Sequence, residues 1–376
     1  MRIHAQKMLL ENGFCNDCTV EVEDGMIRQI MPGKQADWHA DVLTPGLIDL
    51  HCHGGEGFNP EHADEESLSR FLRKMQSSGV TDFWLTTSTS PRDVIRRALA
   101  AARNAMARQK AGTLGGARIQ GVHLEGPFLS SARPGAMLKG AILPPDIAAY
   151  QDIFGDYGDV IREITLAPEE AGAAELIGYL KTLGVKVQAG HTYATYEQAM
   201  AGFDAGVESL CHSFNACRPI HHRDPGVVVA AMERKEVYME AICDFLHLHP
   251  AIVKLIYREK GPDRMIVISD SVFSHGFPDG QYDMHGYQFV VKDGVNRTLE
   301  GALDGGVAYL DQSVRNLISI GIPPEDAVAM ASRTPAARAG MTGLGAIAPG
   351  KRAHLTAWDS GWHPVFTVVE DEVTPC

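Results

Sequence analysis

The sequence predicts an α/β fold, in which a TIM-type (β/α)8 barrel carries a small β-sandwich domain built from both ends of the chain. Through the middle of the chain, eight short apolar runs alternate with stretches of helical periodicity, which is the pattern of βα units around a parallel sheet. Short strand-like segments with turn residues occur near both termini. A chain of 376 residues, 45% of them hydrophobic, can fill one large barrel and a small satellite domain.

The segment near the N-terminus is predicted to form a β-hairpin. Its two apolar patches, residues 18–22 and 26–31, flank a turn at Asp24 and Gly25. Near the other end, residues 345–358 again alternate turn residues with a short strand. We therefore expect residues 1–45 and 345–376 to form one small β-domain that is discontinuous in sequence, and residues 46–344 to form the barrel.

The eight apolar runs are the candidate barrel strands. They cover residues 46–51, 82–87, 119–125, 161–167, 185–190, 207–212, 237–244 and 265–270. Helical periodicity marks connections between them at residues 65–77, 92–109, 171–183 and 196–205. An open, doubly wound sheet is the alternative, but no G-x-G-x-x-G motif follows the first strand, which weakens a dinucleotide-binding version of that fold.

The charge balance limits the partners that we expect. A formal net charge of −13 argues against nucleic acid as the main partner, because binding to a phosphate backbone depends on basic patches. A small phosphorylated substrate needs only a few local cations. No segment reaches the roughly 18 uninterrupted apolar residues of a membrane span, and no N-terminal stretch has the pattern of a signal peptide. We therefore expect a soluble, cytoplasmic protein with no membrane partner.

The seven cysteines are scattered along the chain, so we expect the reduced thiols of a cytosolic protein and no disulfide framework. Cys15 and Cys18 form a C-x-x-C pair, but no second pair follows at the spacing of a zinc finger. A loop or an edge strand is the expected place for this pair.

Polar residues of metal-binding types stand at the ends of five of the eight predicted strands. They are His51 and His53 at the first strand, Glu125 at the third, His191 after the fifth, His212 at the sixth and Asp270 at the eighth. The active site of such a barrel forms where the C-terminal ends of its strands meet, so these residues should converge on one pocket. A single histidine at a strand end is more often a hydrogen-bonded interior residue, but five such coincidences favour a metal site.

The types of these residues suit hydrolytic chemistry. His51 and His53 are two residues apart in a strand, so both can face the barrel mouth. Imidazole and carboxylate ligands suit Zn²⁺, with Fe²⁺ or another first-row ion as the alternative, in a site that keeps a position open for water. A bound ion lowers the pKa of water from about 15.7 to near 7, and Asp270 could then act as the proton shuttle. A nucleophilic serine is the competing mechanism, but no G-x-S-x-G motif occurs.

A series of longer motifs includes these residues. They are TPGLIDLHCHGG at 44–55, GVHLEGPF at 121–128, AGHT at 189–192, HSFNA at 212–216, RDPG at 223–226, SDS at 269–271, VRNL at 314–317 and ASRTPA at 331–336. Their order and spacing resemble the N-acetylglucosamine-6-phosphate deacetylase family of the amidohydrolase superfamily, including its N-acetylgalactosamine-6-phosphate deacetylases. The resemblance extends over nearly the whole chain.

The resemblance implies an enzyme of amino-sugar catabolism that hydrolyses the N-acetyl amide of an N-acetylhexosamine 6-phosphate, of either gluco or galacto configuration, and that forms a homodimer. It implies Asp270 as the catalytic acid/base and Glu125, His191 and His212 as metal ligands. Some family members lack the first-strand His-x-His and use one ion. The chain has this motif, His51 and His53, so either one ion or two ions bridged by Glu125 is expected.

The resemblance also implies the residues that contact the substrate. They are Ala136, Asn215, Ala216, Arg223, His247 and Leu303. Arg223 is expected to meet the phosphate, because its planar guanidinium matches phosphate oxygens with two donors at once. Asn215 and Ala216 would hold the sugar phosphate, and His247 would bind near the phosphate or the sugar.

Three departures from the family pattern fall in the expected substrate shell. Met137 stands where the family usually has a histidine, Phe245 where it has a glycine, and Leu303-Asp-Gly-Gly306 replaces an Ala-Gly-Ser loop. Hydrolysis is therefore predicted more firmly than the identity of the sugar. Another amide hydrolase of the superfamily, acting on a cyclic amide or an N-acyl amino acid, is the nearest alternative, and a non-catalytic scaffold is a further one.

Overall fold

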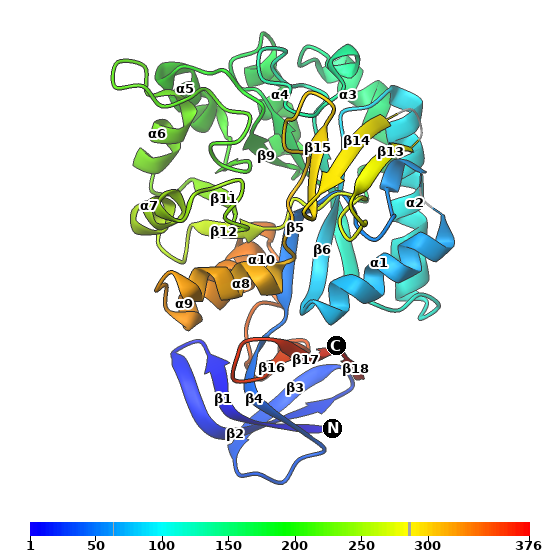
Figure 1. Ribbon diagram of the computed structural model, residues 1–376, viewed down its shortest axis with the longest axis vertical. Helices are drawn as coiled ribbons and strands as arrows, with labels where there is room; N and C mark the ends of the chain where they lie inside the picture. Colours follow the sequence, from blue (N-terminus) through cyan, green and yellow to red (C-terminus); the bar gives the residue numbers. More distant parts are fainter. Residues whose placement is uncertain (63, 285–286) are drawn as a thin grey trace.

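The computed structural model describes residues 1–62, 64–284 and 287–376 (Figure 1). Its largest sheet has eight parallel strands that are adjacent in chain order. These strands are β5 (Leu47–Cys52), β6 (Val80–Thr87), β7 (Arg118–Glu125), β8 (Ile161–Leu166), β9 (Lys186–Ala189), β10 (Ser209–Leu210), β11 (Tyr238–Ile242) and β12 (Met265–Ile268). All eight coincide with the predicted runs, and the predicted fold class is confirmed.

The first and the last strand are joined at their C-terminal ends. The Asp270 N–H donates to the His51 carbonyl at 2.9 Å, and the His53 N–H donates to the Ser271 carbonyl at 2.8 Å. Cys52 and Ser271 form a parallel bridge between these two contacts. The barrel is therefore closed by the same segments that carry three of the predicted site residues.

Helices follow the barrel strands and cover the outside of the sheet (Figure 1). They are α1 (Glu65–Ser77), α2 (Arg92–Lys110), α3 (Ile147–Phe154), α4 (Ala173–Thr182), α5 (Tyr196–Ala205), α6 (Gly226–Glu233), α7 (Pro250–Lys260), α8 (Leu310–Ser319), α9 (Pro324–Met330) and α10 (Arg333–Ala339). Both α1 and α5 have the predicted bounds, because Asp64 caps α1 and a capping box of Thr195 and Gln198 begins α5. Within the described residues, no helix combines the length and apolar character that spanning a membrane requires.

Both ends of the chain form one seven-stranded sheet, in the order β18-β17-β16-β4-β1-β2-β3. Its strands are β1 (Arg2–Leu10), β2 (Gly13–Glu23), β3 (Met26–Pro32), β4 (Trp38–Pro45), β16 (His354–Trp358), β17 (Pro364–Val369) and β18 (Glu372–Pro375). Figure 1 shows this sheet at one end of the molecule, with both termini in it. The predicted hairpin is confirmed as β2 and β3. A buried pair, His354 and Asp82 at 2.7 Å, links the sheet to the barrel.

One element was not predicted. After the last barrel strand, β13 (Gly280–Met284), β14 (Tyr287–Lys292) and β15 (Val295–Thr298) form a small antiparallel sheet. Stacked aromatic rings support it, with Tyr282 and Tyr287 on either side of Phe289 at centroid distances of 5.2 Å and 5.8 Å. Such contacts stabilise a short sheet, and burial alternates along its first two strands.

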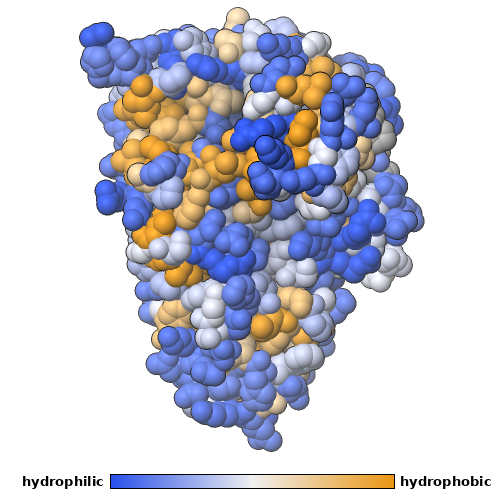
Figure 2. Space-filling model, viewed as in Figure 1, coloured by the Kyte–Doolittle hydropathy of each residue, from blue (hydrophilic) through white to orange (hydrophobic). Residues whose placement is uncertain are grey.

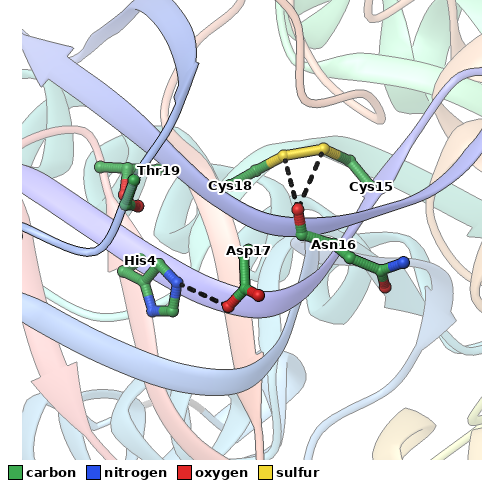
Figure 3. Close-up of a disulfide and its surroundings, with 7 residues drawn as sticks. His4, Cys15, Asn16, Asp17, Cys18 and Thr19 are labelled. Atoms are coloured by element: carbon green, nitrogen blue, oxygen red, sulfur yellow. Dashed lines mark hydrogen bonds and ion pairs between the residues drawn. A yellow bond between two sulfur atoms is a disulfide. The ribbon is translucent and has the colours of Figure 1, made fainter.

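The expectation of reduced cysteines is wrong for one pair. Cys15 and Cys18 form a disulfide within β2, with their Cα atoms 6.3 Å apart (Figure 3). Residues three apart in a regular strand lie farther apart and on opposite faces, but Asp17 between them has a φ of +50° and turns the backbone. The other five cysteines are free, and four of these are buried.

Candidate active site and metal centre

The predicted metal ligands and the predicted acid/base, Asp270, lie at the C-terminal end of the barrel. His51 is in β5 and His53 follows it, Glu125 ends β7, and His191, His212 and Asp270 lie two residues beyond β9, β10 and β12. The last three have positive φ values, of 47°, 21° and 50° respectively. Residues other than glycine adopt this conformation at a cost of about 1–3 kcal/mol each, and such strain is concentrated at functional sites.

Glu125, His191 and His212 form the first ligand group. The Oε1 atom of Glu125 is 3.0 Å from His191 Nε2 and 2.9 Å from His212 Nε2. All three side chains are buried. Their ligand atoms are close enough together to surround a single ion.

His51, His53 and Asp270 form the second ligand group. The Nε2 atom of His51 is 3.2 Å from His53 Nε2 and 3.3 Å from Asp270 Oδ1. The other oxygen of Glu125, Oε2, is 3.0 Å from His53 Nε2. The Glu125 carboxylate therefore contacts both groups, and its Oε1 is also 3.6 Å from His51 Nε2.

The spacing of imidazole nitrogens tests whether a metal ion fits. The Nε2 atoms of His191 and His212 are 3.1 Å apart, close to the spacing of His51 and His53. His191 Nδ1 donates its proton to the Arg133 carbonyl at 3.1 Å, so its Nε2 presents a lone pair to the group. Ligands at about 2.0–2.1 Å from a tetrahedral Zn²⁺ lie about 3.3 Å from each other. Both nitrogen pairs have this spacing, so the residues fit a divalent ion.

Charges within the cluster control its ionisation. Burial is the largest influence on Glu125 and opposes its ionisation, but His51 and His191 hold its pKa well below the ordinary value. Burial likewise lowers the pKa of His191, yet the adjacent Glu125 carboxylate raises it overall. The carboxylate is therefore ionised, which is the form that binds a metal ion.

Most of the predicted site residues line one cavity of about 660 Å³. They are His53, Glu125, Ala136, His191, His212, Asn215, Ala216, His247, Asp270 and Leu303. His51 lies beneath this surface and is fully buried. The structure thus brings together residues from segments that are up to about 250 positions apart in the sequence.

Arg223 is the predicted substrate residue that does not line the cavity. It is exposed, and its Nη1 is 2.8 Å from His222 Nε2. A tight turn, in which the His221 and Asp224 backbones are paired, carries Arg223 at its tip. Among the residues that the structure describes, no lysine or arginine lines the cavity.

One of the three departures, Phe245, lies elsewhere than expected. Met137 lines the cavity, and its Sδ accepts the Thr89 N–H at 3.3 Å. Phe245 does not line it and packs against the barrel core, with a φ of +63° that explains why a glycine is usual there. In the loop of residues 303–306, Leu303, Asp304 and Gly305 line the cavity and Gly306 does not. A Cβ at Gly306 would be 2.0 Å from the Ser269 carbonyl oxygen, so this position has no room for a side chain.

His247 is held in the cavity wall by a buried carboxylate. Its Nδ1 is 2.8 Å from Asp244 Oδ2, and the His247 backbone N–H also donates to Asp244 at 2.9 Å. Burial lowers the pKa of His247, but the hydrogen bond to Asp244 raises it overall. The ring therefore carries positive charge more readily and keeps Nε2 for a ligand in the cavity.

The sequence missed several lining residues. Asn59, Glu61 and His62 follow the first barrel strand, and Met284 and Tyr287 come from the small antiparallel sheet. The first three could have been expected, because the loops after barrel strands form the active-site face. The other two depend on a sheet that was not predicted.

The sequence matches known proteins along almost all of its length. The model of the amidohydrolase family matches residues 42–375. An N-acetylgalactosamine-6-phosphate deacetylase of Escherichia coli O157:H7 is 35% identical over 365 residues, which is 96% of each chain. An N-acetylglucosamine-6-phosphate deacetylase of Vibrio furnissii is also 35% identical, over 95% of this chain and 90% of its own.

A solved structure is similar in fold. An N-acetyl-D-glucosamine-6-phosphate deacetylase mutant from Mycobacterium smegmatis, in complex with N-acetyl-D-glucosamine-6-phosphate, superposes with a TM-score of 0.91. The two chains are 30% identical, and the match covers 99% of this chain and 98% of the other.

The shared position of Glu125 leads to a prediction about metal content. We expect Glu125→Ala to lose metal from both ligand groups, because each group loses a ligand from the same carboxylate. Elemental analysis after dialysis against a chelator measures this. The control is Glu61→Gln, since Glu61 lines the cavity but bonds to Ser90, and it should keep the wild-type metal content. Stoichiometric metal in Glu125→Ala would contradict the assignment.

Proposed function

This chain belongs to the amidohydrolase family, and we propose that it hydrolyses the N-acetyl amide of an N-acetylhexosamine 6-phosphate to the amino-sugar phosphate and acetate. The observation that carries the proposal is Glu125, which has one oxygen facing His191 and His212 and the other facing His53, all in the wall of one cavity. Relatives with this activity in their names cover almost the whole chain at 35% identity, for both the gluco and the galacto substrate. The proposal therefore includes both sugars.

We propose that the two ligand groups hold two divalent ions, bridged by Glu125. Of three groups of possible ligand atoms, the two that contribute residues to the cavity lining support two ions rather than one, and the third, His51 with Cys211 and Glu240, shares His51 with the second ligand group. Imidazole with carboxylate suits Zn²⁺, with Fe²⁺ as the alternative. Bound ions would supply Lewis acidity, which polarises the amide carbonyl and makes water acidic near neutral pH.

Asp270 is proposed as the catalytic acid/base. Its side chain is 14% exposed and lines the cavity, and its Oδ1 is 3.5 Å from His53 Nε2. In this position the carboxylate takes a proton from the water that attacks the acetyl carbon. It then gives a proton to the amide nitrogen as the C–N bond breaks, so that the amine leaves and acetate remains.

Substrate recognition is proposed for residues around the same cavity. The Nε2 of His247 would donate to a phosphate or sugar oxygen, and Asn215 with the Ala216 backbone would hold the sugar phosphate. Ala136 and Leu303 would contact the sugar. The homodimer implied by the resemblance also remains a prediction, and Figure 2 shows apolar side chains gathered on the barrel part of the surface, which a second copy could cover.

A second candidate is hydrolysis of an unphosphorylated N-acyl amide. It is favoured by the absence of lysine and arginine from the described cavity lining, and by apolar lining residues such as Met137 and Phe273. The two candidates share the metal centre and Asp270, so they differ only in what the outer part of the cavity recognises.

We expect Asp270→Asn to lower kcat by at least about a hundredfold, which is the lower range for losing a positioned acid/base. Acetate release is measured on protein whose metal content has been determined, so that metal loss is separated from loss of the proton shuttle. Asp304→Asn is the matched control, since Asp304 also lines the cavity but bonds to Tyr287 and Asn296, and should lose much less. Wild-type turnover in metal-replete Asp270→Asn would remove Asp270 from the mechanism.

A substrate panel distinguishes the two candidates. We expect a much higher kcat/KM for the 6-phosphates of both N-acetylhexosamines than for the free sugars. The resemblance assigns Arg223 to the phosphate, although its turn lies outside the cavity lining of this chain. On that assignment Arg223→Ala should raise KM for the phosphorylated substrate selectively, because charge-assisted hydrogen bonds are roughly twice as strong as neutral ones. Arg28→Ala, an exposed arginine paired with Glu23 in the small sheet, serves as the control. Equal rates on phosphorylated and free sugars would favour the second candidate, and an equal effect of Arg223→Ala on both would exclude Arg223 as a phosphate ligand.

A further inference from the structure

Glu240 is a buried carboxylate inside the barrel that the proposed reaction does not use. It lies in the middle of β11, and its side chain is 1% exposed. Within the part of the chain that the structure describes, Glu240 forms an ion pair with the His51 imidazole and with no lysine or arginine. Glu163, another carboxylate inside the barrel, instead pairs with the buried Arg338 guanidinium. Burying a carboxylate costs free energy unless hydrogen-bond donors replace the water molecules that it loses. The stability of a buried, ionised Glu240 therefore depends on the donors around it.

A single oxygen of Glu240 meets three donors. Its Oε2 is 3.0 Å from Gln188 Nε2, 3.3 Å from the His212 backbone nitrogen and 3.3 Å from His51 Nδ1. The Glu240 carbonyl also accepts the Ser213 N–H at 2.9 Å. Glu240 therefore touches one ligand of each group, the ring of His51 and the backbone of His212.

The two ends of the His51 ring face different surroundings. Its Nε2 is directed at the second ligand group, and a neutral imidazole binds a metal ion there only when its proton is on Nδ1. The Nδ1 proton then needs an acceptor, and Glu240 Oε2 lies opposite it. Cys211 Sγ is also near, at 3.6 Å, but sulfur is a weak acceptor.

We infer that Glu240 is a positioning residue for the metal centre, which fixes the tautomer and the orientation of His51 and anchors the backbone at His212. The inference rests on the proposed two-ion site. The ring of His191 relies on a backbone carbonyl and that of His53 on the Ser88 hydroxyl at 3.3 Å. Of these three rings, only His51 has a carboxylate opposite its Nδ1 atom, and such an outer carboxylate raises the basicity of a ligating imidazole.

A purely structural role would have different consequences. If Glu240 only filled space and bonded to Gln188, an apolar residue of similar volume would change the stability of the barrel without changing how the ions are held. A positioning role instead predicts a loss of affinity mainly for the ion at His51. The ratio of the two ion affinities therefore distinguishes the roles.

The test compares Glu240→Gln and Glu240→Leu with the full-length wild type. Glutamine keeps an acceptor oxygen but loses the charge, whereas leucine loses both. Dissociation constants for Zn²⁺ are measured for each ion by competition with a chromogenic chelator, and melting is followed by circular dichroism. We expect Glu240→Leu to weaken the ion at His51 by about 10–100-fold, which is the range for loss of an outer partner of a ligand. Glu240→Gln should weaken it by a smaller factor, and the ion at His191 should change less in both.

Glu163→Gln is the matched control, because it removes another buried carboxylate charge from the barrel without contacting a predicted metal ligand. It should leave both dissociation constants unchanged, even if it melts at a lower temperature. Unchanged dissociation constants for both ions in Glu240→Gln and Glu240→Leu would overturn the inference. If the leucine variant does not fold, the dissociation constants of Glu240→Gln test the inference by themselves. The measured quantity is ion binding, so the two proposals can fail separately. If the wild type binds two ions but does not deacetylate N-acetylhexosamine 6-phosphates, the proposed function is contradicted and the role of Glu240 is not.

Discussion

The arrangement of the site depends on one carboxylate, Glu125, that faces two pairs of histidines. Its Oε1 lies within 3.0 Å of His191 and His212, and its Oε2 lies 3.0 Å from His53. A buried carboxylate with several imidazoles around it is stable as an ion only if the surrounding charge is positive. The parallel barrel supplies this arrangement, because its strands deliver their last residues to the same end.

The fold and the inner part of the site could be predicted from the sequence because both rest on local patterns. Each buried parallel strand is a short apolar run, and α1 and α5 carry capping residues at their starts. Residues that follow such runs must gather at one end of the barrel. All of the site residues so found except the fully buried His51 line the same cavity.

The remaining features depend on contacts that the local sequence pattern does not predict. The Cys15–Cys18 disulfide requires the positive φ of Asp17 between them, and the sheet of β13, β14 and β15 includes cross-strand stacking of Tyr282 on Phe289. Arg223 was placed by resemblance, yet its turn carries it outside the cavity of this chain. Glu240 lies in mid-strand, so its contact with His51, 189 positions away, is visible only in three dimensions.

Anomalous scattering from crystals of the metal-loaded protein tests the central claim most directly, since it locates ions without relying on activity. Two peaks should flank the Glu125 carboxylate. One should lie about 2.0–2.2 Å from ligand atoms of His191 and His212, and the other at that distance from His51 and His53. A single peak at the first group would contradict the bridged two-ion centre, and no peak beside Glu125 would contradict the metal-dependent mechanism altogether.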